Sequence, residues 1–228
     1  MKACFSLVNR VIITSVDQAD RLERKKRSLE GTVILKHIRA LIFDLDGTLV
    51  TSTLDFVQIR RELGCSAEDD VLEFVEQLGG REREEAHEII HRHEVRDAEA
   101  SEWLPGAQAF IHECHAHQIP LAIVTRNSDF SSRLKIARNQ IPISHLVTRE
   151  NSRPKPDPSA LQEIARSFSM EPGEMMMVGD YRYDLEAGRN AKMQTCLINF
   201  ESLPDYAHLA DYRFSDFDRF HQAFFSAR

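Results

Sequence analysis

The feature that most constrains this fold is a regular alternation, from His37 onward, of short apolar runs with longer amphipathic segments. Short apolar runs bounded by turn residues are typical of buried strands, and the amphipathic segments are typical of helices. The predicted strands are Ile38–Phe43, Leu121–Thr125, His145–Thr148, Met175–Val178 and Thr195–Ile198. Strands that alternate with helices form mostly parallel sheets covered on both faces, so the sequence predicts an α/β fold.

One segment, Ser52–Trp103, breaks this alternation because it contains helical patterns and no strand candidate. The predicted helices are Leu54–Leu63, Asp69–Leu78 and Arg81–Glu102. An insertion directly after the first strand lies over the carboxyl end of the sheet, where ligands bind in open α/β folds. We therefore expect three parts: a weakly ordered extension over residues 1–36, a core of residues 37–51 and 104–228, and a small helical cap over residues 52–103.

The composition limits the partners of the chain. With 228 residues and 29 Lys and Arg against 36 Asp and Glu, the net charge is −7, and such a protein repels polyanions. No stretch approaches the ~18 apolar residues that a membrane span needs. The four cysteines form no Cys-x-x-Cys pair, so neither a zinc ribbon nor a disulfide framework is indicated. We expect a cytoplasmic protein, monomeric or homodimeric, that binds neither nucleic acid nor membranes.

Candidate chemistry begins with two carboxylates, Asp44 and Asp46, at the exit of the first predicted strand. Both project toward the same crevice once the chain turns, and Gly47 permits that turn. Close carboxylates do not both stay ionised without a cation, so the pair predicts either a metal site or a split into a nucleophile and an acid/base. Taken alone, Asp-x-Asp-Gly is equally typical of an Asx turn after a strand.

Later strand ends also carry polar residues suited to catalysis. Each of them alone is more often an ordinary surface residue. Occurring in order on successive strands, they form a set that chance rarely supplies. The set consists of Thr125, Arg126 and Asn127 after the second strand, Lys155 among three prolines that stiffen the backbone, and Asp180 with Asp184 after the fourth strand.

These motifs, Asp44-Leu45-Asp46-Gly47-Thr48, Thr125, Lys155 and Gly179-Asp180 with Asp184, together resemble the haloacid dehalogenase superfamily of hydrolases. The similarity is to its phosphoglycolate-phosphatase-like branch, which carries a helical cap of the C1 type after the first strand, and it covers about residues 38–222. The resemblance implies a Rossmann-like three-layer core, a Mg²⁺ cofactor and hydrolysis of a small phosphate ester through an aspartyl-phosphate.

The resemblance also implies roles for individual residues. Asp44 is the expected nucleophile, and Asp46 the expected acid and base. Thr125 and Lys155 are expected to hold the phosphoryl oxygens. The expected metal-site residues are Asp44, Asp46 through its carbonyl, Asp180 and Asp184, and the expected substrate-binding residues are Gly47, Thr48, Arg126 and Asn127.

Three other functions have to be weighed for a member of this family. A dehalogenase needs no acid at Asp46, so the presence of that residue disfavours this activity. A phosphomutase and a non-catalytic phospho-ligand-binding module remain alternatives to the phosphatase.

Substrate choice is expected to depend on the cap and the loops that face it. Arg126 is suited to grip a carboxylate or a second phosphate with its planar fork, or to pair with a local acid. Further candidates near the cap entrance are Ser52, Asp55 and Arg60.

A histidine pair raises the possibility of zinc, because His87 and His91 lie four residues apart in a predicted helix. The surrounding residues Glu84, Glu85, Glu88 and Glu94 instead favour a solvated helix face. The run Met175-Met176-Met177 is interpreted as buried strand rather than as a ligand set.

Overall fold

The computed structural model describes residues 35–226, which divide into two compact units. Residues Ile38–Arg219 form one unit, and the other contains the described residues 35–37 and 220–226. The expectation of a weakly ordered extension over residues 1–36 lies outside the described residues except for Leu35 and Lys36, which belong to the 3-10 turn η1 (Leu35–His37). Within the described part, no helix is both long enough and apolar enough to cross a membrane.

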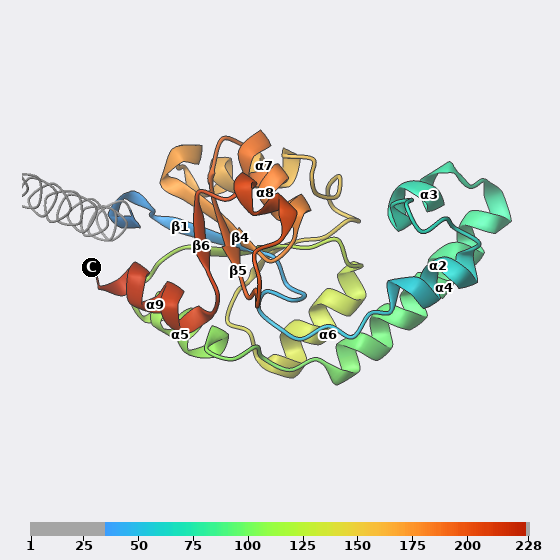
Figure 1. The fold of residues 1–228 in the computed structure, drawn as a ribbon, viewed down its shortest axis with the longest axis horizontal. Coiled ribbons are helices and arrows are strands. Elements are labelled where there is room, and N and C mark those ends of the chain that lie inside the picture. The colour runs from blue at the N-terminus through green and yellow to red at the C-terminus, as the bar shows by residue number, and fades with distance from the viewer. Residues whose placement is uncertain (1–34, 227–228) are drawn as a thin grey trace, which may run out of the picture. The chain divides into compact units, whose positions relative to one another are not determined.

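The described residues contain one sheet of six parallel strands in the order β3-β2-β1-β4-β5-β6 (Figure 1). The five predicted strands are all present, and β6 was not predicted. β1 lies between β2 and β4, so the chain changes direction across the sheet at this point, and ligands bind at such switch points. The strands are β1 (Ala40–Phe43), β2 (Leu121–Val124), β3 (His145–Val147), β4 (Met175–Gly179), β5 (Gln194–Ile198) and β6 (Tyr212–Phe214).

Helices cover both faces of the sheet, because successive strand residues point to opposite sides. Ala40 and Ile42 belong to the apolar cluster that includes residues of α7 and α8, whereas the Phe43 ring packs edge-on against Phe110 of α5, with ring centroids 6.2 Å apart. The three-layer α/β architecture is therefore confirmed. The helices of the core are α5 (Ala107–Ala116), α6 (Asp129–Asn139), α7 (Ser159–Phe168) and α8 (Arg182–Asn190), and α9 (Phe217–Phe225) runs across the boundary between the two units.

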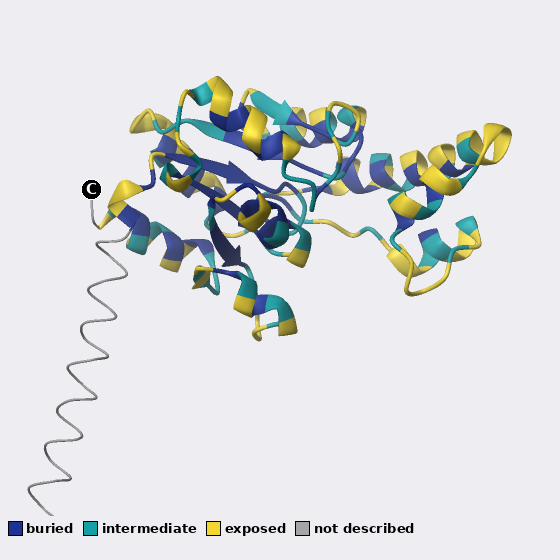
Figure 2. Ribbon diagram, turned by 90° about the horizontal axis from the view of Figure 1, so that it is seen from above, coloured by how far each residue is buried: buried dark blue, intermediate teal, exposed yellow. Residues whose placement is uncertain are grey.

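The central strands are fully buried, as their apolar sequences predict (Figure 2). Met175, Met176 and Met177 are each 0% exposed, so the interpretation of this run as buried strand is confirmed. Burying a side chain of this size contributes roughly 1.5–3 kcal/mol. Short 3-10 turns, η2 (Pro172–Glu174) and η3 (Asp205–Leu209), precede β4 and β6.

The segment between β1 and α5 is helical, as predicted, and contains α2 (Phe56–Leu63), α3 (Val71–Gln77) and α4 (Gly80–Ala100). We refer to these three helices and their loops as the cap. The cap has its own apolar cluster, formed by Ile59, Val71, Val75, Ala86 and Ile90. Its two connections to the core run side by side, because Val50 and Trp103 form an antiparallel bridge.

The long helix α4 is attached to the core helix α6 near its carboxyl end. The Trp103 indole donates a hydrogen bond to the carbonyl oxygen of Asn139 at 2.7 Å. The Arg138 Nε donates to the carbonyl oxygen of Ser101 at 3.0 Å. The cap is therefore joined to the core through contacts with α6 as well as through its two connecting segments.

Candidate active site

The turn that follows β1 brings its residues against the turn that follows β4. Gly47 has a φ of 72°, which L side chains rarely adopt, and a Cβ built on it would lie 2.4 Å from Asp180 Oδ2. The Asn199 side chain donates hydrogen bonds of 3.0 Å to the carbonyl oxygens of Gly47 and Thr48. A glycine is therefore required here both for the backbone conformation and for the close approach of Asp180.

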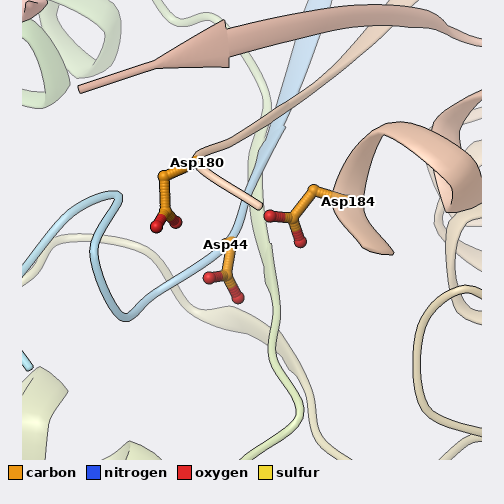
Figure 3. Close-up of side chains that lie close together, drawn as sticks. All are labelled: Asp44, Asp180 and Asp184. Carbon is orange, nitrogen blue, oxygen red and sulfur yellow. The ribbon is translucent and has the colours of Figure 1, made fainter. Parts of the chain in front are cut away.

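Three carboxylates gather at this edge of the sheet (Figure 3). Asp44, Asp180 and Asp184 each offer one oxygen, and these oxygens lie within 4.8 Å of one another. The Thr48 hydroxyl donates a hydrogen bond of 2.8 Å to Asp180 Oδ1. Asp184, in the first turn of α8, accepts a hydrogen bond of 3.0 Å from the backbone N–H of Tyr181.

One ammonium group, that of Lys155, lies within this cluster. Its Nζ is 2.5 Å from Asp44 Oδ1 and 2.6 Å from Asp184 Oδ1, and the residue is 2% exposed. Burial lowers the pKa of Lys155, but its attraction to Asp184 and Asp44 outweighs this effect, so the pKa is raised and the lysine stays charged. The lysine charge is thus paired with two of the three carboxylates of the cluster.

The electrostatic consequence is largest at Asp180. Burial, together with repulsion from Asp184 and Asp44, raises the pKa of Asp180 to about 8. Burial also raises the pKa of Asp184 to about 6, although Lys155 opposes the rise. Without a further cation, the three carboxylates do not all remain ionised at neutral pH.

Asp46 lies in a different environment from Asp44. Its Oδ2 accepts a hydrogen bond of 2.6 Å from Asn127 Nδ2, and its Oδ1 accepts one from Lys135 Nζ. Burial raises the pKa of Asp46 to about 6, although the attraction of Lys135 lowers it. The two aspartates of the motif are therefore held by different lysines.

Thr125 follows β2, which pairs directly with β1 and aligns Ile123 with Phe43. The threonine is 3% exposed, and its hydroxyl accepts a hydrogen bond of 3.2 Å from the backbone N–H of Asn127. This register places the carboxyl end of β2 beside that of β1. Polar residues that follow parallel strands therefore meet at the same edge of the sheet.

A cavity of about 510 Å³ joins almost all of the site residues expected from the sequence. Thr48 is not among its lining residues; it is fully buried and bonded to Asp180, which does line the cavity. On the cap side the wall is mainly apolar. The lining residues from the expected set are Asp44, Asp46, Gly47, Thr125, Arg126, Asn127, Lys155, Asp180 and Asp184, and the apolar ones of the cap are Leu54, Phe56, Ile59, Val71, Leu72 and Ile90.

Arg126 is paired with an acid, although one far away in the sequence. Its Nη2 lies 2.7 and 2.6 Å from the two carboxylate oxygens of Asp70, and its Nη1 donates to the carbonyl oxygen of Lys155 at 2.6 Å. The guanidinium also lies over the Tyr183 ring, 4.4 Å from its centroid. Asp70 caps the amino terminus of α3, so this ion pair connects the cap to the site.

The three candidates near the cap entrance divide between the cavity and the cap. Ser52 and Arg60 line the cavity. Asp55 is absent from the lining and instead accepts a hydrogen bond of 2.9 Å from Gln58 N, as the N-cap of α2.

The interpretation of the glutamates around the histidine pair as a solvated face is wrong for one residue. His87 and His91 are exposed, but Glu94 on the same helix is 4% exposed. It pairs with Arg149 and accepts a hydrogen bond of 2.7 Å from the Ser128 hydroxyl. Glu94 lies one turn beyond Ile90 of the cap cluster, on the same buried face of α4, so its side chain is directed away from solvent. Within residues 35–226, only the aspartate cluster brings three such metal-ligand atoms together.

Sequence reasoning missed the residues that hold the expected ones in place. Lys135, Asp97, Asp70 and Asn199 lie within helices and loops, outside the strand-end pattern. The one available signal was Asn199, which directly follows the predicted strand over Thr195–Ile198.

Comparison with known proteins agrees with the sequence motifs. Residues 38–192 match the haloacid dehalogenase-like hydrolase family. An uncharacterized hydrolase of Saccharomyces cerevisiae is 32% identical over 200 residues, which cover 82% of this chain and 91% of the yeast protein. A phosphoglycolate phosphatase of Chromobacterium violaceum is 27% identical over 206 residues, covering 73% of this chain and 87% of that enzyme.

A solved structure shares the fold. The haloacid dehalogenase family hydrolase of Deinococcus radiodurans superimposes with a TM-score of 0.64 at 17% identity, and the match covers 83% of this chain and 96% of that chain. The resemblance stated from the motifs is thus confirmed by an independent match over most of the chain. The protein is a member of the haloacid dehalogenase-like hydrolase family.

Proposed function

We propose that the protein is a Mg²⁺-dependent phosphatase that hydrolyses a small phosphate monoester through a phosphorylated Asp44. One observation carries this proposal: two neighbouring aspartates face one cavity in different environments. Asp44 lies beside Lys155 and the acidic cluster, whereas Asp46 accepts hydrogen bonds from Asn127 and Lys135. Carboxylates in different environments are suited to different roles. The relative named phosphoglycolate phosphatase supports the same class of reaction.

The residues of the acidic cluster fit a divalent cation. The three carboxylates lie close together, only Asp44 and Asp184 pair with the ammonium group of Lys155, and hard carboxylate oxygens are the ligands that Mg²⁺ prefers. We propose that Asp44, Asp180 and the backbone carbonyl of Asp46 hold the ion. Asp184, bonded to Lys155 and to the N–H of Tyr181, is better suited to orienting its neighbours. Bound Mg²⁺ would neutralise charge on the carboxylates and on the phosphoryl oxygens.

In the proposed first step, a carboxylate oxygen of Asp44 attacks the phosphorus atom and the bond from phosphorus to the leaving oxygen breaks. Asp46 gives its proton to that leaving oxygen. The elevated pKa of Asp46, about 6 because of burial, keeps a fraction of this side chain protonated near neutral pH. Lys155 pairs with Asp44, and both Lys155 and Thr125 line the cavity, which suits them to hold the phosphoryl oxygens.

In the proposed second step, Asp46 takes a proton from a water molecule, whose oxygen attacks the phosphorus atom. The bond to Asp44 then breaks, which releases inorganic phosphate and restores the carboxylate of Asp44. Asp46 accepts hydrogen bonds on both carboxylate oxygens in the structure, an arrangement that suits its ionised form as a base.

A direct experiment tests the proposal. Phosphate release from phenyl phosphate, 4-nitrophenyl phosphate and a panel of small phosphate esters is measured with Mg²⁺ and with a chelator, for the wild type and for Asp44→Asn. We expect turnover that requires Mg²⁺ and is lost in Asp44→Asn, and the best ester identifies the substrate class. Folded protein that releases no phosphate from any ester would refute the phosphatase in favour of a mutase or a binding module.

A further inference from the structure

A lysine in the middle of α6 is fully buried at the boundary between the core and the cap. Lys135 is 0% exposed, and its Nζ forms ion pairs with both Asp46 Oδ1 and Asp97 Oδ2. Transfer of an ammonium group from water to a buried site is unfavourable unless it is paired and hydrogen-bonded. The chain places this charge between the expected acid/base aspartate on one side and a residue of α4 on the other.

Asp97, the second partner of Lys135, lies where the chain enters and leaves the cap. It is 4% exposed and belongs to α4, near the end that returns to the core. Its carboxylate also accepts hydrogen bonds of 3.0 Å from the Ser52 hydroxyl and 3.1 Å from the Thr53 hydroxyl, and another from Thr53 N. Ser52 and Thr53 belong to the outgoing connection, so Asp97 bonds this connection to the last turn of α4, from which the chain returns to the core.

The contact between Lys135 and Asp46 restricts the rotation of the Asp46 carboxylate. Lys135 binds Oδ1 and Asn127 binds Oδ2, so the two donors hold the two oxygens of the group separately. A carboxylate held at one oxygen rotates about its terminal torsion, which is broad, whereas donors at both oxygens fix its plane. The orientation of that plane sets the distance between the Asp46 oxygen that carries the proton and the leaving oxygen.

We propose that Lys135 is a positioning residue that orients the acid/base carboxylate of Asp46 and couples this orientation, through Asp97, to the connections of the cap. This inference rests on the proposed phosphatase function. Lys135 touches neither phosphate nor metal in this role, and acts only through Asp46. A purely structural triad would instead join the cap to the core without affecting proton donation.

The distinguishing measurement is the dependence of kcat/KM on the leaving group. For a phosphoryl enzyme, kcat/KM reports the steps up to the first irreversible one, which is the transfer to Asp44 with proton donation by Asp46. Phenyl phosphate and 4-nitrophenyl phosphate have nearly the same shape, but the phenyl leaving group is more basic and depends more on a proton donor. The ratio of their kcat/KM values therefore reports how much proton donation by Asp46 contributes to catalysis.

We expect Lys135→Met to lower kcat/KM for phenyl phosphate about 100-fold and that for 4-nitrophenyl phosphate less than about 10-fold, since general acid catalysis contributes about 10²–10⁴. In an Asp46→Asn background the same substitution should leave the ratio unchanged, because its target is missing. Arg149→Met serves as the matched control. It removes another ion pair with α4, that to Glu94, and a hydrogen bond to the Arg126 carbonyl oxygen. It does not touch Asp46, so it should change both esters alike.

Each outcome decides the proposal. An unchanged ratio in folded Lys135→Met, or an equal further change of the ratio in the Asp46→Asn background, would overturn the positioning role. If Lys135→Met does not fold, Asp97→Asn weakens the hold on the same lysine from the cap side. The ratio should then shift about threefold or more in the same direction, and no shift would refute the coupling. A wild type that releases phosphate from no ester of the panel would refute the proposed function, and this inference with it.

Discussion

Replacing Gly47 with alanine tests whether the turn after β1 is built around the approach of Asp180. The substitution has two separate effects in the structure. The backbone has a φ of 72°, and the added Cβ would lie 2.4 Å from Asp180 Oδ2 and 2.8 Å from its Cγ. The first effect concerns the free energy of unfolding, and the second concerns the position of a proposed metal ligand.

The expected magnitudes follow from these distances. A left-handed conformation costs an alanine about 1–2 kcal/mol of stability. Ordinary contacts of a Cβ begin near 3.4 Å, so the carboxylate of Asp180 must retreat by about 1 Å. A displacement of ~1 Å at a reacting centre lowers activity about 100-fold. We therefore expect Gly47→Ala to lose roughly two orders of magnitude in turnover, beyond its moderate loss of stability.

Gly64 provides the matched control, because its φ is 69° and a Cβ there would meet no atom within 4 Å. Gly64→Ala should lose the same 1–2 kcal/mol in urea unfolding while its phosphate release with Mg²⁺ stays near that of the wild type. The reasoning is wrong if Gly47→Ala keeps wild-type turnover, or if Gly64→Ala loses as much turnover as Gly47→Ala does.

Two further substitutions test neighbouring contacts. Thr48→Val keeps the shape of a fully buried residue but removes the hydrogen bond to Asp180. The Mg²⁺ concentration for half-maximal turnover should therefore rise about 10-fold in a metal titration. An unchanged titration would contradict the proposed role of Asp180. Asp70→Asn keeps the N-cap of α3 but removes the charge that pairs with Arg126. The kcat/KM for phosphoglycolate should therefore rise about threefold or more relative to that for phenyl phosphate. An equal change for both esters would show that Arg126 does not bind the leaving group.

Much of the fold could be predicted because it follows from local patterns. Buried parallel strands are short apolar runs, and the five runs identified in the sequence all became strands. The strand β6 was missed because Tyr212-Arg213-Phe214 is only three residues long and carries a charge at its centre. The cap helices were predicted with somewhat longer bounds, since Leu54 and Asp69 precede the N-cap residues Asp55 and Asp70. Helix ends depend on such capping contacts more than on periodicity.

The strand-end residues of the candidate site were visible for a topological reason. The carboxyl ends of neighbouring parallel strands meet at one edge of a sheet, so Asp44, Thr125 and Asp180 converge whenever their strands pair. Lys135 had no such signal. In the run Asp129–Asn139 it is one of three basic residues in an amphipathic helix, and it is buried where α4 and the turn after β1 meet α6. Contacts between residues 89 positions apart, such as that between Lys135 and Asp46, depend on this packing.

This difference between strand ends and helix contacts explains why the class of reaction is readable from the sequence and the substrate is not. The phosphoryl group would meet strand-end residues, which a short motif records. The leaving group would meet the cap side of the cavity, where Arg126 is paired with Asp70 across a separation of 56 residues. Because the charge that Arg126 presents depends on this partner, inspection of Arg126 alone leaves both alternatives open, an anion of the substrate or a paired acid. The substrate class therefore depends on which cap residue faces each core residue, and the Asp70→Asn variant measures that dependence at one such pair.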